Sequence, residues 1–321
     1  MYGSELKYGN YRPTKNWEMN NILKVALILF FIGSLFWITY DEWSLFQGKI
    51  RSISLISIAE ISALFIFSQC INGYMLKEFL KVFKINLEFQ EWFGLISIQS
   101  LGNYLPLSAG LASNAVYLNL NKQLSVFNFV SYVAGHTLLK CFTLGTIGLL
   151  LISYRAIFYN EFKPLISIIL LALLTFSCVA IFTKNFKSEY KLLQFFLQIQ
   201  DGWKHIKRDQ YLLVKSITSH IFSLIIIALQ FQIVFMEIDI EISYIVILLI
   251  TILTNIIRIT SIFPGNLGLR ESISGFVTET YSLSFGLGLV GAVVTRVISM
   301  FWIFLFGIIF SFYIGLNKTA K

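Results

Sequence analysis

The sequence predicts an all-α polytopic membrane protein of two inverted repeats, each with three full spans and a broken or re-entrant segment. Three observations lead to this fold class: an apolar composition, a series of apolar runs, and two proline-glycine breaks in equivalent places. Of the 321 residues, 56% are hydrophobic and 13% are charged, and the mean hydropathy is +0.74. Soluble domains carry about 25% charged residues. We therefore expect a single membrane domain, 1–321.

Apolar runs follow one another along the chain, and most have the roughly 20 residues that a helix needs to cross a bilayer. They lie at 22–40, 52–76, 92–118, 127–153, 164–183, 211–235, 242–263, 267–283 and 286–315. We assign the first four to a first repeat, 1–160, and the others to a second repeat, 161–321. The first 21 residues are polar, and no signal-peptide cleavage pattern follows the first run.

Two of these regions are interrupted by proline and glycine. The run 92–118 contains LGNYLPLSAGL around Pro106, and SIFPGNLGLRE around Pro264 joins 242–263 to 267–283. Proline removes a backbone donor and glycine relaxes the backbone, so both stretches should separate helical segments. The expected break or hinge residues are Pro106, Gly110, Pro264, Gly265 and Gly268.

The two breaks superpose at one offset. Pro106, Gly110 and Leu111 fall on Pro264, Gly268 and Leu269 at an offset of 158, close to half of the 321 residues. A broken segment that re-enters or crosses twice returns the chain to its starting side. Each half then makes an odd number of net crossings, so the second repeat should be inverted relative to the first.

The distribution of basic residues supports this topology. With a cytoplasmic N-terminus, 15 basic residues fall in inside loops and 4 in outside loops, as the positive-inside rule requires. The inside set is Lys7, Arg12, Lys15, Lys77, Lys81, Lys84, Lys122, Lys184, Lys187, Lys191, Lys204, Lys207, Arg208, Lys318 and Lys321, and the outside set is Lys49, Arg51, Arg155 and Lys163. We expect a multi-pass protein of the cell (cytoplasmic) membrane with both termini cytoplasmic.

Ionisable residues inside the apolar runs are costly there and usually have a function or a buried partner. They are Glu60, Lys140, Arg258, Arg270, Glu271, Glu279 and Arg296, accompanied by His136, His220, Asn72, Asn103, Asn114 and Asn255. Arg258, Arg270 and Glu271 flank the Pro264 break. When the two repeats are superposed, Lys140 and Arg296 fall within about one helical turn of each other. Each repeat should therefore place one cation near the axis that relates the two repeats.

A broken helix presents backbone N–H groups and a positive dipole end to its surroundings, and transporters hold anionic groups at such breaks. Arginine adds a bidentate fork that suits phosphate. We therefore predict a site for a phosphate-bearing lipid headgroup. Its expected residues are Arg258, Arg270, Arg296, Lys140, His136 and Asn103, with Glu271 and Glu60 holding the cations in place.

Structural roles remain open for each of these residues. Arg270 and Glu271 can be interfacial charges at a helix start, and Arg258 can pair with Glu60 or Glu279. Lys140 and His136 can form a satisfied buried pair, and we expect His220 to be structural. Cys70, Cys141 and Cys178 lie in apolar runs without metal-ligand spacing.

Catalytic motifs are missing from the sequence. We find no HExxH, GxSxG, P-loop or paired acidic motif, and the three histidines are scattered. His136 and Glu60 would form an acid-base pair only if the fold joined them. We therefore predict that the protein is not an enzyme and uses no metal and no cofactor. Because the sequence has no ATP-binding motif, transport would be passive or coupled to an ion gradient.

The segment FPGNLGLRES, followed by a long apolar span with a lone arginine, resembles the lysylphosphatidylglycerol synthase transmembrane region family of flippase-like membrane proteins. The family pattern P-x-G-G-(L/I)-G-(V/L)-x-E is similar to the stretch from Pro264 to Glu271, with Asn266 in place of one glycine. Asn also tolerates left-handed backbone geometry. Arg296 matches the arginine of the later span, and Asn114 stands near an arginine of the family's first break.

The resemblance implies the flippase-like region without a soluble transferase domain. The expected function is translocation between leaflets of an anionic, phosphate-bearing lipid, such as an aminoacylated phospholipid or a lipid-linked sugar. The alternative is a membrane enzyme or accessory subunit acting on a polyprenyl-phosphate-linked sugar, with Glu60 or Glu271 as base. A scaffold without transport activity is a third reading. The expected partners are the lipid substrate, the bilayer, a second copy of the chain or a separate synthase, and no nucleic acid.

Overall fold

The computed structural model describes residues 53–104, 109–182, 207, 209–260 and 264–319, and the regular elements within them are all helical. The expected span 22–40, Pro106 and most of the basic loop 184–210 lie outside the described residues. The elements are α3 (Leu55–Leu80), η1 (Lys81–Phe83), α4 (Phe89–Gly102), α5 (Ala109–Lys122), α6 (Val126–Tyr159), α7 (Pro164–Phe182), α9 (Gln210–Glu237), α10 (Tyr244–Thr260), η3 (Pro264–Asn266), α11 (Leu269–Thr280) and α12 (Phe285–Thr319).

Four stretches in the described part of the chain are long and apolar enough to cross a membrane. They are Leu55–Phe83, Val126–Tyr159, Gln210–Glu237 and Phe285–Ile314. The expected span 164–183 corresponds to a shorter apolar helix, Pro164–Ala180, and Tyr244–Ile259 is shorter as well. The all-helical membrane character is therefore confirmed, whereas the expected length of the span at 164–183 is only partly matched.

Polar caps define the starts of the long helices. The hydroxyl of Ser54 accepts a hydrogen bond from the N–H of Ser57 (3.1 Å) at the start of α3, and Ser125 does the same for Asn128 (3.1 Å) at the start of α6. The carboxylate of Asp209 caps α9. Such caps satisfy N–H groups that the helix itself leaves without an acceptor.

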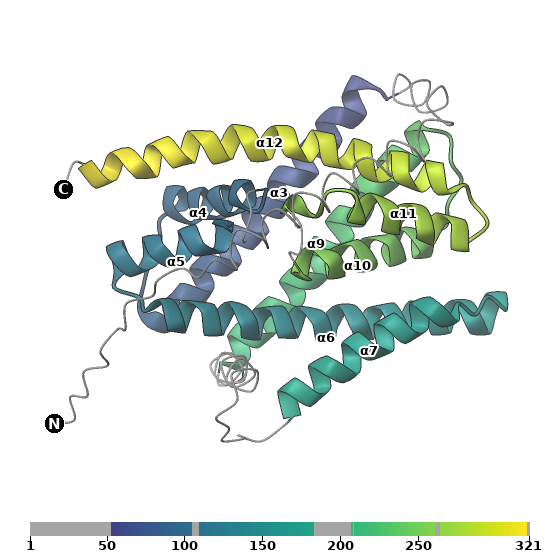
Figure 1. Ribbon diagram of the computed structural model, residues 1–321, viewed down its shortest axis with the longest axis horizontal. Helices are drawn as coiled ribbons and strands as arrows, with labels where there is room; N and C mark the ends of the chain where they lie inside the picture. The colour runs from purple at the N-terminus through teal and green to yellow at the C-terminus, as the bar shows by residue number, and fades with distance from the viewer. Residues whose placement is uncertain (1–52, 105–108, 183–206, 208, 261–263, 320–321) are drawn as a thin grey trace, which may run out of the picture.

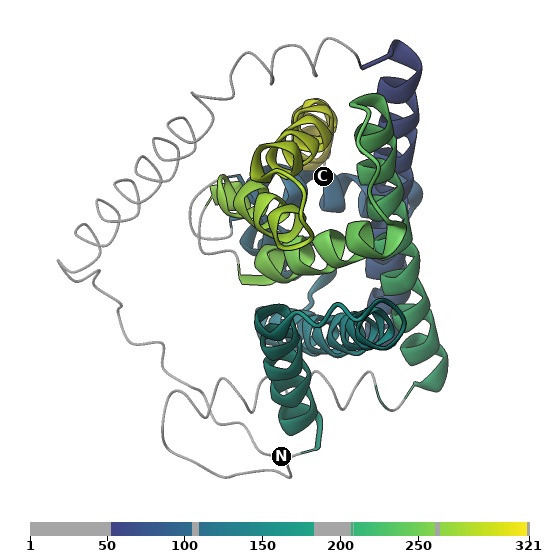
Figure 2. The same ribbon diagram turned by 90° about the vertical axis from the view of Figure 1, so that its right-hand side faces the viewer.

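Helices α3 and α9 lie side by side and antiparallel, as Figures 1 and 2 show. At one end, the Ser57 hydroxyl donates to Glu237 Oε1 (2.6 Å). At the other end, Lys215 Nζ forms an ion pair with Glu78 Oε2 (2.6 Å). The start of each helix is thus fastened to the end of the other. The two helices lie in equivalent parts of the two predicted repeats.

The long helices α6 and α12 lie on opposite sides of the described core and cross α3 and α9 steeply (Figure 2). Helix α12 packs on α4, where a methyl group added at Gly94 would lie 2.8 Å from the Phe310 ring. Helix α6 packs on α7, where Gly148 lies against Leu170. Small residues let apolar helices approach closely when burial against lipid supplies little driving force.

The end of α6 corrects one sequence assignment. Arg155, which was counted as an outside loop residue, lies near the C-terminal end of α6 and is buried. Its Nε donates to Glu161 Oε2 (3.0 Å), and its guanidinium lies 4.8 Å from the centre of the Tyr281 ring. The neighbouring carboxylate and ring compensate the burial, which a count of loop charges does not consider.

Both predicted breaks separate helices. In the first, α4 ends at Gly102 and α5 begins at Ala109, and a methyl group on Gly102 would lie 2.5 Å from the Gly110 backbone. In the second, α10 is followed by η3 and then by α11. Gly265 (φ 59°), Asn266 (φ 50°) and Gly268 (φ 84°) all have left-handed backbone geometry. These are the residue types that tolerate it.

Candidate functional site

A backbone hydrogen bond joins the described parts of the two breaks. The N–H of Gly265 donates to the carbonyl of Asn103 (2.7 Å), so the start of the second break is fixed to the end of α4. A methyl group on Gly265 would lie 2.7 Å from the Tyr104 ring and 3.1 Å from Arg296 Nη2. Glycine at 265 is therefore required both by its positive φ and by this close approach.

A buried ion pair lies directly behind this contact. Arg296 Nη1 of α12 lies 2.5 Å from Glu271 Oε1 of α11, and the two side chains are 4% and 5% exposed. Nη2 of Arg296 donates to the Gly265 carbonyl, and Nη1 reaches the Asn266 carbonyl at 3.4 Å. Glu271 Oε2 accepts from the Gly268 N–H (2.9 Å) and caps α11. Arg296 therefore fastens the break to α12.

A small hollow of about 100 Å³ opens beside this junction. Two cations line it, Arg258 from α10 and Arg270 from the first turn of α11. Nε of Arg270 is buried and has no hydrogen-bond partner among the described residues. The polar lining of the hollow is completed by Ser68, Gln69, Asn72, Ser100, Asn103, Tyr104, Asn266, Gln230, Thr295 and Ser299.

A larger hollow of about 460 Å³ continues from the first and shares Gln69, Asn72, Ser100, Asn103 and Arg258 with it. It adds Lys140 and His136 from α6, His220 from α9 and Asn255 from α10. We call the two connected spaces the cationic cavity.

Two side-chain contacts organise the larger part of the cationic cavity. Lys140 Nζ donates to Asn255 Oδ1 (3.3 Å), and the Nε2 atoms of His136 and His220 lie 3.2 Å apart. The two rings can form this hydrogen bond when one nitrogen carries a proton and the other does not. The wall of the cavity contains Lys140, Arg258 and Arg270, and no Asp or Glu is found among the described residues that line it.

The structure brings together most of the residues expected at the site. Arg258, Arg270, Lys140, His136 and Asn103 all line the cationic cavity. Gly265 lines it as well. Arg296 and Glu271 are adjacent but are engaged with each other and with the break, so they position the wall rather than line it.

The remaining candidates lie elsewhere. Glu60 is exposed on α3 and lines neither part of the cavity, and Glu279 is exposed on α11. Ser57, Ile61 and Ser62 are buried, so α3 turns a different face inward. Asn114 is buried in α5, where its Nδ2 donates to Gln99 Oε1 (2.8 Å).

Sequence reasoning missed several polar lining positions, among them Gln69 and Ser100. Gln69 on α3 and Ser100 on α4 form reciprocal hydrogen bonds of 3.3 Å at the junction of the two hollows. The available signal was the polar stripe Ser68, Gln69 and Asn72 in an otherwise apolar run, because residues three to four positions apart share one face of a helix. His220, which was expected to be structural, also lines the cavity.

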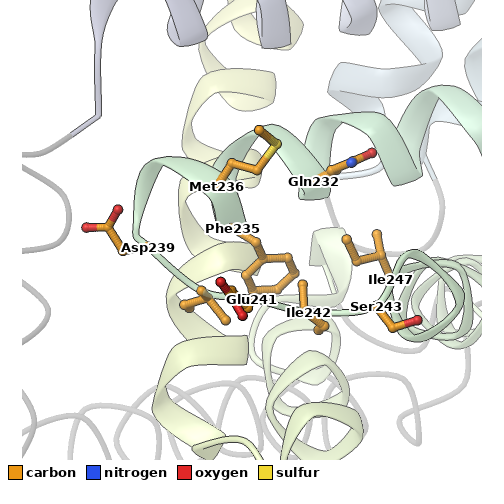
Figure 3. A pocket seen from close by; sticks show the side chains of 9 residues that line it. Gln232, Phe235, Met236, Asp239, Glu241, Ile242, Ser243 and Ile247 are labelled. Carbon is orange, nitrogen blue, oxygen red and sulfur yellow. The ribbon is translucent and has the colours of Figure 1, made fainter.

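A third hollow of about 620 Å³ lies at the connection between α9 and α10, and its described lining residues differ from those of the cationic cavity. Figure 3 shows Asp239 and Glu241 on this connection, beside Phe235 and Met236. No Lys or Arg is among the described residues that line it. Its acidic, apolar lining does not suit an anion.

Comparison with known proteins gives one match. A family model described as the lysylphosphatidylglycerol synthase TM region matches residues 21–307. No curated protein and no solved structure matches the chain.

Proposed function

Since the chain belongs to the lysylphosphatidylglycerol synthase transmembrane-region family, whose members are multi-pass membrane proteins linked to lipid modification or translocation, we propose that it moves an anionic, phosphate-bearing lipid between leaflets. The headgroup passes through the cationic cavity while the lipid chains stay in the bilayer. The substrate is the partner that this proposal requires.

The charge of the cavity carries the proposal. Lys140, Arg258 and Arg270 face one space whose described lining has no carboxylate. Lys140 and Arg270 are half-buried, and a cation at such a position is costly without an opposite charge nearby. A phosphate that enters the cavity supplies that charge, and the guanidinium groups can bind its oxygens in bidentate fashion.

The size and polarity of the cavity suit a headgroup rather than a whole lipid. A volume of about 460 Å³ for the larger part falls within the range of about 300–1,000 Å³ for small-molecule sites. Asn and Gln side chains in the lining both donate and accept hydrogen bonds. They can replace the water that a headgroup loses on leaving the membrane surface.

The helix pairings support the inverted-repeat arrangement that this mechanism uses. The predicted equivalents α3 and α9 pack antiparallel, as two copies of one element do in oppositely oriented repeats. Helix α4 packs on α3, α5 and α12, and its predicted equivalent α10 packs on α9, α11 and α6. We propose that rocking of the repeats exposes the cavity to each side in turn.

The location of the carboxylates favours translocation over catalysis. The rival reading assigns a general base to Glu60 or Glu271. Glu60 is exposed away from the cavity, and both oxygens of Glu271 are engaged, one by Arg296 and the other by the Gly268 N–H. Neither is placed to take a proton from a bound lipid.

Reconstitution tests the proposal. Purified protein in proteoliposomes should move labelled phosphatidylglycerol or a labelled polyprenyl-phosphate sugar from one leaflet to the other without changing it chemically. Protein-free vesicles and vesicles with an unrelated membrane protein provide the background rate. A chemically altered lipid would instead support the enzyme reading, and a background rate with every anionic lipid would refute translocation.

A further inference from the structure

We infer that the headgroup of the transported lipid combines a phosphate with an uncharged part rich in hydroxyl groups, and that the cavity rejects headgroups with free ammonium groups. This inference rests on the proposed function. The substrate class is therefore a glycerol- or sugar-bearing phospholipid or prenyl phosphate. An aminoacylated phospholipid lies outside it.

The first step is the absence of a site for an ammonium group in the described cavity wall. An ammonium donates hydrogen bonds only and is best compensated by a carboxylate. No Asp or Glu is found in the described lining of either part of the cavity.

The nearest carboxylate cannot take this role. Glu271 follows Arg270 directly in the sequence, yet it lines neither part of the cavity. Its Oε1 is bound by Arg296 and its Oε2 by the N–H of Gly268. Turning Glu271 toward a ligand would remove the cap of α11 and leave the guanidinium of Arg296 buried without its carboxylate.

The second step is repulsion by the cations already present. Lys140 enters from α6, Arg258 from α10 and Arg270 from α11, so cations face the space from three helices. A lysyl ester adds two ammonium groups to a single phosphate and makes the headgroup a net cation. Like-charge repulsion from these three cations therefore discriminates against such a headgroup.

The third step is the chemistry of the uncharged lining. Gln69 and Ser100 exchange hydrogen bonds with each other, and Asn72, Asn103 and Asn255 add further amide groups. Each amide offers a carbonyl oxygen and an NH₂ group, which match the combined donor and acceptor character of a hydroxyl group. The lining thus suits glycerol or sugar hydroxyls next to the phosphate.

Parallel transport assays test the inference. The wild-type protein is reconstituted with phosphatidylglycerol, a polyprenyl-phosphate sugar, lysylphosphatidylglycerol or phosphatidylcholine, each as the labelled lipid. The hydroxyl-rich anionic lipids should move at least ten times faster than lysylphosphatidylglycerol. Equal rates for lysylphosphatidylglycerol would overturn the inference and leave translocation standing, whereas background rates for all four lipids would remove the proposed function itself.

Soluble competitors separate a lipid site from a site for free anions. Glycerol phosphate should slow the transport of phosphatidylglycerol more strongly than inorganic phosphate at the same concentration and ionic strength. Equal inhibition by inorganic phosphate would mean that the cavity recognises phosphate alone, and the hydroxyl-rich part of the inference would be lost.

An added carboxylate gives a positive test. Asn72 is exposed and lines both parts of the cavity, and Asn72→Asp changes the charge with almost no change in size. In this variant, the transport rate of lysylphosphatidylglycerol relative to that of phosphatidylglycerol should rise by about tenfold. Gln232→Glu, in the third hollow, should leave this ratio unchanged. An unchanged ratio in folded Asn72→Asp protein would contradict the inference.

Discussion

The guanidinium of Arg296 and the carboxylate of Glu271 form a buried ion pair that joins α12 to the first turn of α11, with 2.5 Å between Nη1 and Oε1. The same guanidinium donates to the Gly265 carbonyl, and the N–H of Gly265 donates to Asn103. One side chain of the second predicted repeat therefore holds the contact between the two breaks.

Arg296→Gln should be severely destabilising. The substitution leaves the Glu271 carboxylate buried without its cation, and breaking a buried pair from one side costs about 3–5 kcal/mol. Thermal unfolding in detergent, followed by intrinsic fluorescence, should show a large fall in the midpoint, with a smaller fall for Arg296→Lys. If Arg296→Gln kept the wild-type midpoint and lost only transport, Arg296 would contact substrate rather than position the break.

Arg270→Gln, unlike Arg296→Gln, should reduce transport without lowering stability. Arg270 lines the cavity, and its buried Nε has no partner among the described residues, so removing the charge costs the empty protein little. We expect an unfolding midpoint equal to or above that of the wild type and at least a tenfold loss of lipid transport. The two substitutions thus separate a substrate ligand from a positioning residue.

Wild-type transport by well-folded Arg270→Gln protein would show that Arg270 does not bind the headgroup. Arg258→Gln and Lys140→Gln extend the comparison, because both side chains line the larger hollow. If the phosphate contacts Arg270, Arg258 and Lys140, each of the three variants should lose transport.

Gly265→Ala should disrupt the second break. Gly265 has a φ of 59°, and the added methyl group would lie 2.7 Å from the Tyr104 ring. Left-handed geometry costs a residue with a Cβ about 1–2 kcal/mol, and the clash adds to it. Asn266→Gly is the matched control, because glycine tolerates the φ of 50° at this position. The change removes the hydrogen bond from Asn266 Nδ2 to the Ile257 carbonyl (2.8 Å).

The thermal unfolding midpoints of the two variants are compared, and the midpoint of Gly265→Ala should be lower than that of Asn266→Gly. Equal midpoints would mean that the junction yields easily to a methyl group. Such a junction could not act as a rigid wall of the cationic cavity.

The breaks could be predicted from the sequence because their causes are local. Pro264 begins η3, and Gly265, Asn266 and Gly268 adopt the positive φ values that their side chains allow. These preferences depend on the residue itself and on its immediate neighbours. Gly110, which was expected at the first break, instead lies in the first turn of α5, where its backbone packs closely against α4.

The roles of the charges could not be predicted, because they depend on how each helix is rotated. Arg270 and Glu271 are adjacent, yet one faces the cavity and the other faces Arg296. Glu60 was expected at the site but lies on an exposed face of α3. A helix that is apolar all round gives little periodic signal for the face that turns inward.

The pairing of His136 with His220 also lay beyond the sequence. The two residues are 84 positions apart and come together only because α6 and α9 cross. Neither residue belongs to a motif with fixed spacing, so only the packing of the long helices reveals the contact.

Cross-linking tests the antiparallel pairing of α3 and α9 in the membrane. In a background with Cys70, Cys141 and Cys178 replaced, cysteines at Ser57 and Glu237 should be joined by a short bifunctional thiol reagent, since the native side chains are in contact at 2.6 Å. Cysteines at Ser57 and Lys215 provide the mismatched control, because Lys215 pairs with Glu78 at the opposite ends of the two helices. Antiparallel packing requires the first pair to cross-link and the second to stay unlinked. The reverse result would mean that the helices run parallel. The equivalent elements of the two halves would then share one orientation, and the inverted repeat on which alternating exposure of the cavity depends would be refuted.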